Sequence, residues 1–134
     1  MRYPVISGFF DLELALNYGV VFGLPAPVWL TILVSLIAGT VVIWYLRTDR
    51  GRAPVVQLYL AFILSGVIGN LVDRLAIGAV RDFILFYAGK ARWPNFNIAD
   101  AFILAGVVLA MIQFILTDEK KERKKIDNQN HKNQ

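Results

Sequence analysis

Cysteine is absent from this chain of 134 residues, and its single histidine, His131, lies in a polar segment near the end. The lack of cysteine excludes disulfides, zinc–thiolate sites, iron–sulfur clusters and cysteine nucleophiles. One histidine in such a segment excludes a Ser-His-Asp triad and a metal site built from several histidines. Charged residues are few, at 18%, whereas hydrophobic residues make up 57%. Because soluble domains are less apolar and more charged than this, the composition excludes a soluble globular enzyme.

Basic residues outnumber acidic ones, which gives the chain a net charge of +4. The excess is spread along the sequence, with eight Lys and Arg in residues 1–117 and six in residues 118–134. A nucleic-acid-binding domain gathers its positive charge on one face. Basic flanks of membrane spans explain the distribution more simply, so no nucleic-acid partner is expected.

Three stretches are long and apolar enough to cross a bilayer, and we place the spans at about 28–46, 53–73 and 97–117. A hydrocarbon core takes about 20 helical residues, and backbone groups in lipid must form hydrogen bonds within their own segment. The sequence therefore predicts an all-α integral membrane protein with three transmembrane helices. Residues 1–117 would form its membrane domain.

The basic residues predict the orientation of these spans. Three arginines occupy the short link 47–52, and five Lys and Arg follow the third span. By the positive-inside rule both groups are cytoplasmic, which places 1–27 and 74–97 outside. The segment 118–134 is then a polar cytoplasmic tail, expected to begin as a helix extension and to end disordered.

Two shorter segments are expected on the outer membrane surface. Residues 9–17 alternate apolar with polar or small side chains, which is typical of a half-buried strand, and a turn is predicted from Asn17 to Gly19. Residues 83–87 are apolar but too short to cross, so we interpret them as an interfacial segment.

Polar residues gather near the outer ends of the spans, where ionisable groups mark a functional site by default. Two of the carboxylates, Asp82 and Asp100, are separated by the interfacial segment and Pro94 and could meet at the outer surface. Two carboxylates held close share a proton, so one can activate water while the other polarises a carbonyl group. A proton or cation pathway, or plain helix ends at the water surface, would place the same residues there. The whole set is Asn17, Asn70, Asp73, Arg74, Arg81, Asp82, Asn97 and Asp100.

Several of these residues also have structural interpretations. Asp73 directly precedes Arg74, and the two could form an ion pair that anchors the helix end. Arg81 could extend its charge toward water. Gly66 and Gly69 are expected to allow close packing of helices.

Four motif blocks resemble those of the lipoprotein signal peptidase (signal peptidase II) family. They are Asn17-Tyr18-Gly19-Val20-Val21-Phe22, Gly69-Asn70-Leu71-Val72-Asp73-Arg74, Gly78-Ala79-Val80-Arg81-Asp82-Phe83-Ile84 and Phe96-Asn97-Ile98-Ala99-Asp100. Their order and spacing match over residues 4–117. The resemblance implies a bacterial inner-membrane aspartic protease, inhibited by globomycin, that removes the signal peptide of diacylglyceryl-modified prolipoproteins just before the lipidated cysteine.

By the same resemblance Asp82 and Asp100 are the catalytic aspartates, and Asp73 supports the site. The residues that line the substrate site are Asn17, Asn70, Arg74 and Asn97. No cofactor and no metal are implied, and the partners are prolipoprotein signal peptides and membrane lipids.

The sequence departs from the family pattern in places. The family has four transmembrane helices, and no match to the first of them is found in this sequence, which fits a fragment, a wrongly chosen start or a natural three-helix form. Val20 and Val21 replace a pair of alanines, and Ala101 stands where serine is frequent. Arg81 stands where an apolar residue is common, and it would lower the pKa of Asp82 if the two side chains approached.

An alternative to the peptidase is a catalytically impaired relative that binds lipidated signal helices. A small ion-conducting protein is a third hypothesis.

Overall fold

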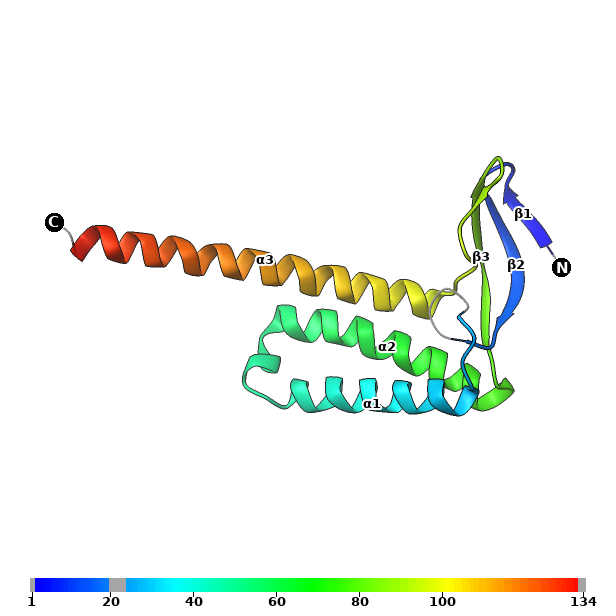
Figure 1. Cartoon of the computed structure of the whole chain (residues 1–134), viewed down its shortest axis with the longest axis horizontal. Coiled ribbons are helices and arrows are strands. Elements are labelled where there is room, and N and C mark those ends of the chain that lie inside the picture. Colours follow the sequence, from blue (N-terminus) through cyan, green and yellow to red (C-terminus); the bar gives the residue numbers. More distant parts are fainter. Residues whose placement is uncertain (1, 20–23, 133–134) are drawn as a thin grey trace.

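The computed structural model describes residues 2–19 and 24–132, and within them three helices carry a small sheet at one end. The helices are α1 (Val28–Leu46), α2 (Pro54–Ile77) and α3 (Ile98–Lys132). Figure 1 shows α1 and α2 side by side, with α3 along α2 and projecting far beyond them. The sheet and the short 3-10 helix η2 (Arg50–Arg52) lie at opposite ends of α1 and α2.

The described part of the chain contains three helices long and apolar enough to cross a membrane, and the protein is a multi-pass membrane protein. The first predicted span has the bounds of α1. The second ends later than predicted, at Ile77 instead of residue 73. The apolar part of α3 runs over Ile98–Asp118, and the helix continues into the predicted tail as far as Lys132. The final two residues of that tail are outside the described residues.

Two glycines let α2 and α3 approach closely. A Cβ atom built on Gly66 would lie 2.2 Å from the carbonyl oxygen of Ala99, and one on Gly106 would lie 2.7 Å from the carbonyl oxygen of Tyr59. Neither distance is possible for a real side chain, so the two backbones need glycine at both points. The packing role predicted for Gly66 is confirmed, and at Gly69 a Cβ atom would lie 3.0 Å from that of Ala99.

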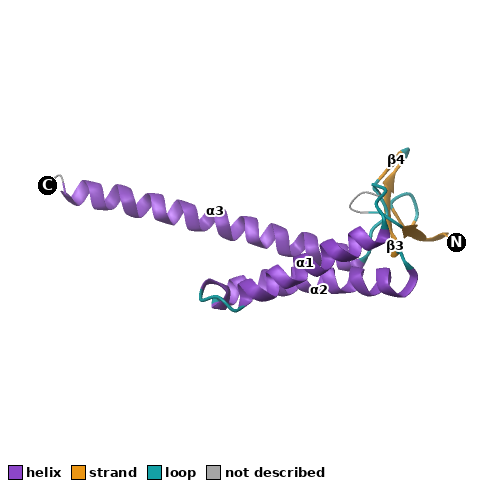
Figure 2. Cartoon of the chain, turned by 60° about the horizontal axis from the view of Figure 1, so that its bottom comes forward, coloured by secondary structure: helices purple, strands orange, loops and turns teal. Residues whose placement is uncertain are grey.

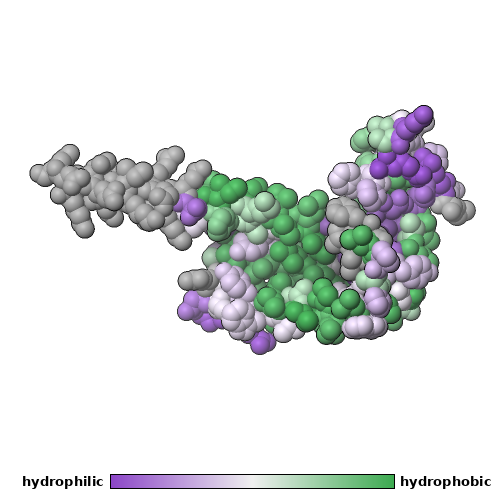
Figure 3. Space-filling view, in the orientation of Figure 1, coloured by the Kyte–Doolittle hydropathy of each residue, from purple (hydrophilic) through white to green (hydrophobic). Residues whose placement is uncertain are grey.

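The central helix α2 also packs against α1. Val42 of α1 meets Val56 and Leu60 of α2 in a small apolar core beside the η2 end. Most other apolar side chains of the three spans point outward. Figure 3 shows apolar residues covering the visible face of the helices, with hydrophilic residues on the sheet and at the opposite end of the helices. An outward-facing apolar surface of this kind suits contact with lipid tails.

The sheet is antiparallel and has the strand order β1-β2-β3-β4 (Figures 1 and 2). Its strands are β1 (Arg2–Ile6), β2 (Phe10–Asn17), β3 (Val80–Ala88) and β4 (Ala91–Arg92). The predicted strand at 9–17 is confirmed by β2. The expectation of an all-α chain with a single strand is wrong, because residues 83–87 are the middle of β3 and pair with β2.

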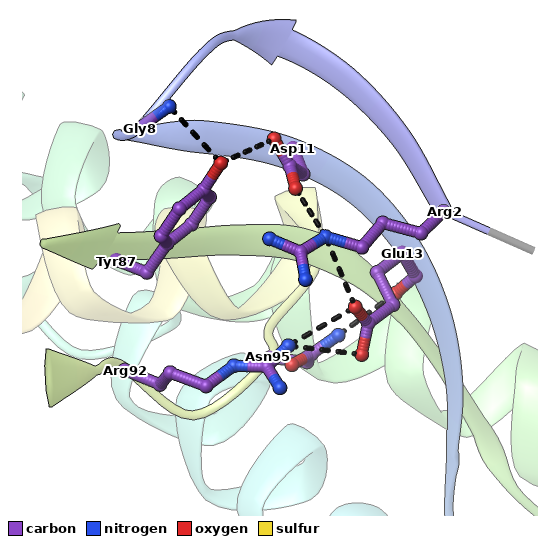
Figure 4. A network of polar contacts seen from close by, with 7 residues as sticks. All are labelled: Arg2, Gly8, Asp11, Glu13, Tyr87, Arg92 and Asn95. Carbon is purple, nitrogen blue, oxygen red and sulfur yellow. Dashed lines mark hydrogen bonds and ion pairs between the residues drawn. The ribbon is translucent and has the colours of Figure 1, made fainter. Parts of the chain in front are cut away.

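A buried carboxylate holds the first three strands together. Asp11 of β2 is 1% exposed and pairs with the Arg2 guanidinium of β1. The Tyr87 hydroxyl of β3 donates to Asp11 Oδ1 at 3.1 Å and accepts from the Gly8 backbone N–H at 3.1 Å (Figure 4). Because each of these partners of Asp11 comes from another strand, the contacts of Asp11 hold β1, β2 and β3 together.

A tight turn connects α2 to β3. Gly78 caps α2 in the left-handed conformation, with φ of 71°, and its N–H donates to the Arg74 carbonyl at 3.0 Å. Glycine suits this position because other residues rarely adopt positive φ. Only Ala79 then separates the cap from β3. The turn therefore brings the start of β3 back beside the last turns of α2.

Candidate active site

The buried carboxylate of Asp82 lies at the centre of the polar cluster. It belongs to β3 and is 2% exposed. Its Oδ2 accepts from Asn17 Nδ2 at 3.1 Å, and its Oδ1 accepts from Asn97 Nδ2 at 2.9 Å. Asn17 comes from the neighbouring strand β2, and Asn97 from the residue just before α3. Three separate elements therefore converge on this carboxylate.

The second carboxylate, Asp100, is held by the start of α3. Its backbone N–H donates to Asn97 Oδ1 at 3.0 Å, and its Oδ2 accepts from the Asn97 backbone N–H at 3.2 Å. This reciprocal pattern resembles a capping box, in which residues three apart satisfy each other's free amide groups. Asp100 is therefore fixed by the geometry that begins the helix.

Asn70 of α2 connects the two sides of the cluster. Its Nδ2 donates to Asp100 Oδ1 at 2.8 Å, and its Oδ1 accepts from Asn97 Nδ2 at 3.0 Å. A continuous set of hydrogen bonds thus runs from Asp82 through Asn97 and Asn70 to Asp100. Asn70 and Asn97 are both buried, and buried polar networks are stable when every member is satisfied. In the described residues, no buried side-chain nitrogen or oxygen lacks a partner.

Arg74 adds positive charge next to the cluster. Its Nη1 donates to the Asn70 carbonyl at 3.4 Å and its Nη2 to the Gly19 carbonyl at 3.3 Å. The guanidinium also interacts electrostatically with Asp82. Arg74 thus links α2 to the turn after β2. The rest of that motif block, Val20 to Phe22, lies outside the described residues.

Asp73 pairs with Arg81, and among the described residues no ion pair joins it to Arg74, so the adjacent ion pair that the sequence left open is not found. Its Oδ2 accepts from the Arg81 backbone N–H at 3.0 Å and its Oδ1 from Arg81 Nε at 3.1 Å. Adjacent residues of a helix do not face each other, whereas the Gly78 turn brings Arg81 back over Asp73. This contact fixes the strand position directly before Asp82.

The pKa of Asp82 lies above its ordinary value because burial penalises the charged carboxylate. The negative charge of Asp100 adds to this effect. The hydrogen bonds from Asn17 and Asn97 and the charge of Arg74 oppose it without cancelling it. Arg81 was expected to lower the pKa of Asp82 only if the two side chains approached. They do not, because the Arg81 guanidinium binds Asp73 and the Arg81 side chain is 53% exposed. Burial therefore favours the protonated form of Asp82.

A groove of about 500 Å³ reaches the cluster from the side where β2 and β3 meet α2 and α3. Asn70 and Asn97 form its polar end, and apolar side chains of Leu14, Phe83 and Ile98 form walls. Its remaining lining residues are Gly69, Asp73, Arg81 and Ala99. The groove therefore combines a polar end with apolar walls.

The structure brings together all seven predicted site residues, although Asp73 lies at the edge of the cluster. Sequence reasoning did not find Glu13, Arg92 and Asn95, which tie β2 to the segment before α3. The only signal for them was an acidic residue in an alternating strand, which is common at strand surfaces. In the described residues, no three His, Cys, Asp or Glu side chains gather as metal ligands.

Residues 1–116 match the family model described as signal peptidase (SPase) II. The chain belongs to the signal peptidase II family. A lipoprotein signal peptidase of Symbiobacterium thermophilum is 37% identical over 117 residues, which cover 87% of this chain and 77% of that protein. One of Syntrophus aciditrophicus is 39% identical over 124 residues, covering 88% and 77%. Membership of this family makes the chain a protease.

Two solved structures share the fold of this signal peptidase II family member. One, a bacterial membrane enzyme determined at 2.3 Å resolution by the in meso method, superposes with a TM-score of 0.83 at 25% identity and covers 90% of this chain and 74% of that one. A second bacterial membrane enzyme, at 1.9 Å resolution, gives 0.74 at 25% identity, covering 85% and 74%.

Proposed function

We propose that this signal peptidase II family member is an aspartic endopeptidase that removes signal peptides from diacylglyceryl-modified prolipoproteins, with cleavage just before the lipidated cysteine. The observation that carries the proposal is the hydrogen-bonded link between Asp82 and Asp100 through Asn97 and Asn70. These two residues, called the aspartate pair below, belong to one hydrogen-bonded network although one lies in a strand and the other in a helix.

In the proposed mechanism, the aspartate pair holds one proton and titrates as a unit. The ionised carboxylate takes a proton from water, whose oxygen attacks the scissile carbonyl carbon. The protonated carboxyl donates its proton to the carbonyl oxygen, which gives a neutral tetrahedral diol. The C–N bond then breaks as one carboxyl proton passes to the leaving amine and a diol hydroxyl gives its proton to the other carboxylate, which leaves the pair with one proton again. The hydrogen-bond donors around the pair hold it at a fixed geometry during these transfers.

The substrate is a membrane-embedded signal helix with two acyl chains, so it reaches the site from the lipid. Asn17, Asn70, Arg74 and Asn97 would hold its backbone and lipid head region, and Asp73 would support the site. The site lies at the sheet end of the helices, opposite the arginines of the 47–52 link. By the positive-inside rule this is the outer face of a bacterial inner membrane, with the C-terminus cytoplasmic.

The test is cleavage of a purified diacylglyceryl-prolipoprotein in detergent, followed by gel shift, with and without globomycin. Asp82→Asn and Asp100→Asn should each abolish cleavage while the protein stays folded. Asp49→Asn, at the exposed opposite end of the helices, is the matched control and should cleave normally. Binding of the substrate without cleavage by the unsubstituted protein would overturn the peptidase and favour the impaired relative that binds lipidated signal helices.

A further inference from the structure

The strand pair that carries Asp82 contains a bulge next to this residue. Leu12 of β2 pairs with Ile84 of β3, but the next registered pair is Ala15 with Asp82. Glu13 and Leu14 therefore stand opposite Phe83 alone. A bulge of this kind leaves backbone groups without partners in the ladder.

The bulge decides which face of β2 meets Asp82. With it, Asn17 pairs with Val80, two residues from Asp82, so Asn17 and Asp82 point to the same face. If the register of Leu12 with Ile84 continued without the extra residue, Asn17 would lie opposite Ala79 and on the other face. Because side chains alternate along a strand, the contact between Asn17 and Asp82 requires the bulge.

Groups at the bulge are bound by the segment that leads into α3. The Glu13 carbonyl accepts from Asn95 Nδ2 at 2.8 Å. Opposite it, the Phe83 backbone N–H donates to the Phe96 carbonyl at 3.0 Å, and the Phe96 N–H donates to the Ile84 carbonyl at 3.1 Å. Both strands of the bulge are thus held by two consecutive residues, Asn95 and Phe96.

The Glu13 side chain adds a charged contact to the same segment. Its carboxylate, 29% exposed, accepts from Arg92 Nη2 at 3.0 and 3.2 Å and lies 3.6 Å from Arg2 Nε (Figure 4). Figure 4 shows Asn95 and Arg92 reaching Glu13 from the same side of β2. Glu13 therefore holds the segment through both its carbonyl and its side chain.

We infer that Asn95, bound to the bulge carbonyl of Glu13, is a positioning residue that sets the location of Asn97 and through it the geometry of the aspartate pair. Asn95 is two residues before Asn97, which touches Asp82 directly and begins the helix that carries Asp100. The bulge and the helix start thus determine the two carboxylate positions together. The kinetic test of this inference rests on the proposed peptidase function. A second test, a titration of Asp82, rests on the fold alone.

The kinetic test compares Asn95→Ala with Asn95→Gln, which keeps an amide donor, and with Lys90→Ala, an exposed change in the β3–β4 turn. Misplacement of a reacting group by about 1 Å costs up to about 100-fold in rate. We expect Asn95→Ala to lower kcat at least about 10-fold with little change in KM, and Asn95→Gln to recover part of the loss. Lys90→Ala should behave like the unsubstituted protein.

The pH profile separates positioning from folding. The charged and polar groups that face Asp82 are Asn17, Asn97, Arg74 and Asp100. If Asn97 moves, Asp82 loses a hydrogen bond that favours its ionised form. The high-pH limb of kcat should then move to higher pH in Asn95→Ala. A loss of activity proportional to the folded fraction, with an unmoved pH profile, would overturn the inference.

A second measurement does not need cleavage. The carboxyl titration of Asp82 is followed by NMR in detergent with ¹³C-labelled aspartate, and its signal is assigned by its loss in Asp82→Asn. The midpoint should rise in Asn95→Ala and stay unchanged in Lys90→Ala. An unchanged midpoint in Asn95→Ala would overturn the positioning role even if the unsubstituted protein is inactive. Inactivity of the unsubstituted protein would instead overturn the proposed function.

Discussion

Asn97 donates one hydrogen bond to Asp82, at 2.9 Å, and at the same time caps the helix that carries the second aspartate. One side chain thus joins the start of α3 to the centre of the site. Helix stability and site geometry depend on the same residue, but through different atoms. The Oδ1 atom serves the cap, and Nδ2 serves Asp82 and Asn70.

Substitution of Asn97 can separate these two roles. Asn97→Ser keeps a capping oxygen but loses the amide donor, whereas Asn97→Ala loses both. Loss of an N-cap costs about 1 kcal/mol, so Asn97→Ala should melt at a lower temperature than Asn97→Ser. Both variants should cleave prolipoprotein at least about 10-fold more slowly, because a misplaced reacting group is costly. Full activity in Asn97→Ser would show that the contact with Asp82 is dispensable.

The raised pKa of Asp82 predicts how stability depends on pH. The folded state favours the protonated carboxyl, so this contribution to stability is fully present below the unfolded pKa of about 3.9. It is lost as the pH rises through the higher folded pKa. Asn in place of Asp82 mimics the protonated form and does not titrate. Melting temperatures of the protein and of Asp82→Asn should therefore diverge with rising pH, with the variant more stable. Parallel curves would contradict a raised pKa.

The same proton predicts the alkaline limit of activity. An aspartate pair needs one proton to polarise the scissile carbonyl, so cleavage should fall as the pair loses its last proton. The limb belongs to the pair and not to a single residue. The measurement is kcat against pH, with melting checked at each pH. Constant kcat far above neutral pH, in folded protein, would contradict the proposed mechanism.

The close approach of α2 and α3 predicts that alanine in place of Gly66 destabilises the protein, whereas alanine in place of Gly39 does not. Gly66→Ala would place Cβ 2.2 Å from the Ala99 carbonyl oxygen, and overpacking costs about 1–3 kcal/mol. Gly39 of α1 is the matched control, because its Cβ would meet only side-chain atoms at 3.9 Å. Gly39→Ala should be neutral or stabilising, by up to about 1 kcal/mol from helix propensity. Equal melting temperatures in detergent for the two variants would contradict this packing.

The contact between Asp73 and Arg81 predicts unequal effects for its two partners. Arg81→Gln removes an exposed guanidinium and should change the melting temperature little. Asp73→Ala also removes the acceptor of the Arg81 backbone N–H, which costs about 1 kcal/mol. It should also lower cleavage, because it loosens the position before Asp82. Equal melting temperatures for the two variants would show that the backbone contact contributes nothing.

The spans and the first long strand could be predicted because their signals are local. Length and apolarity define α1, and alternation over 9–17 defines β2. The central strand β3 was not predicted, since its run from Phe83 to Tyr87 is apolar on both sides and shows no alternation. Its partner β2 lies about 70 residues earlier in the sequence, and a local hydrophobic pattern does not indicate which distant segment a strand pairs with.

The members of the site could be predicted from the motif blocks, but their connections could not. Asn17 and Asp82 are 65 residues apart, and only the sheet register brings them together. The partner of Asp73 could not be predicted, because adjacency in sequence is not adjacency on a helix. The catalytic and binding roles of these residues stay predictions.

The bulge in β2 has a consequence for how the length of this chain can change during evolution. A single-residue insertion or deletion between Leu12 and Ala15 would turn Asn17 away from Asp82. The same change at the exposed β3–β4 tip, at Gly89 and Lys90, would leave the pairing of β2 with β3 unchanged. Length variation among functional relatives should therefore be frequent at the tip and nearly absent at the bulge.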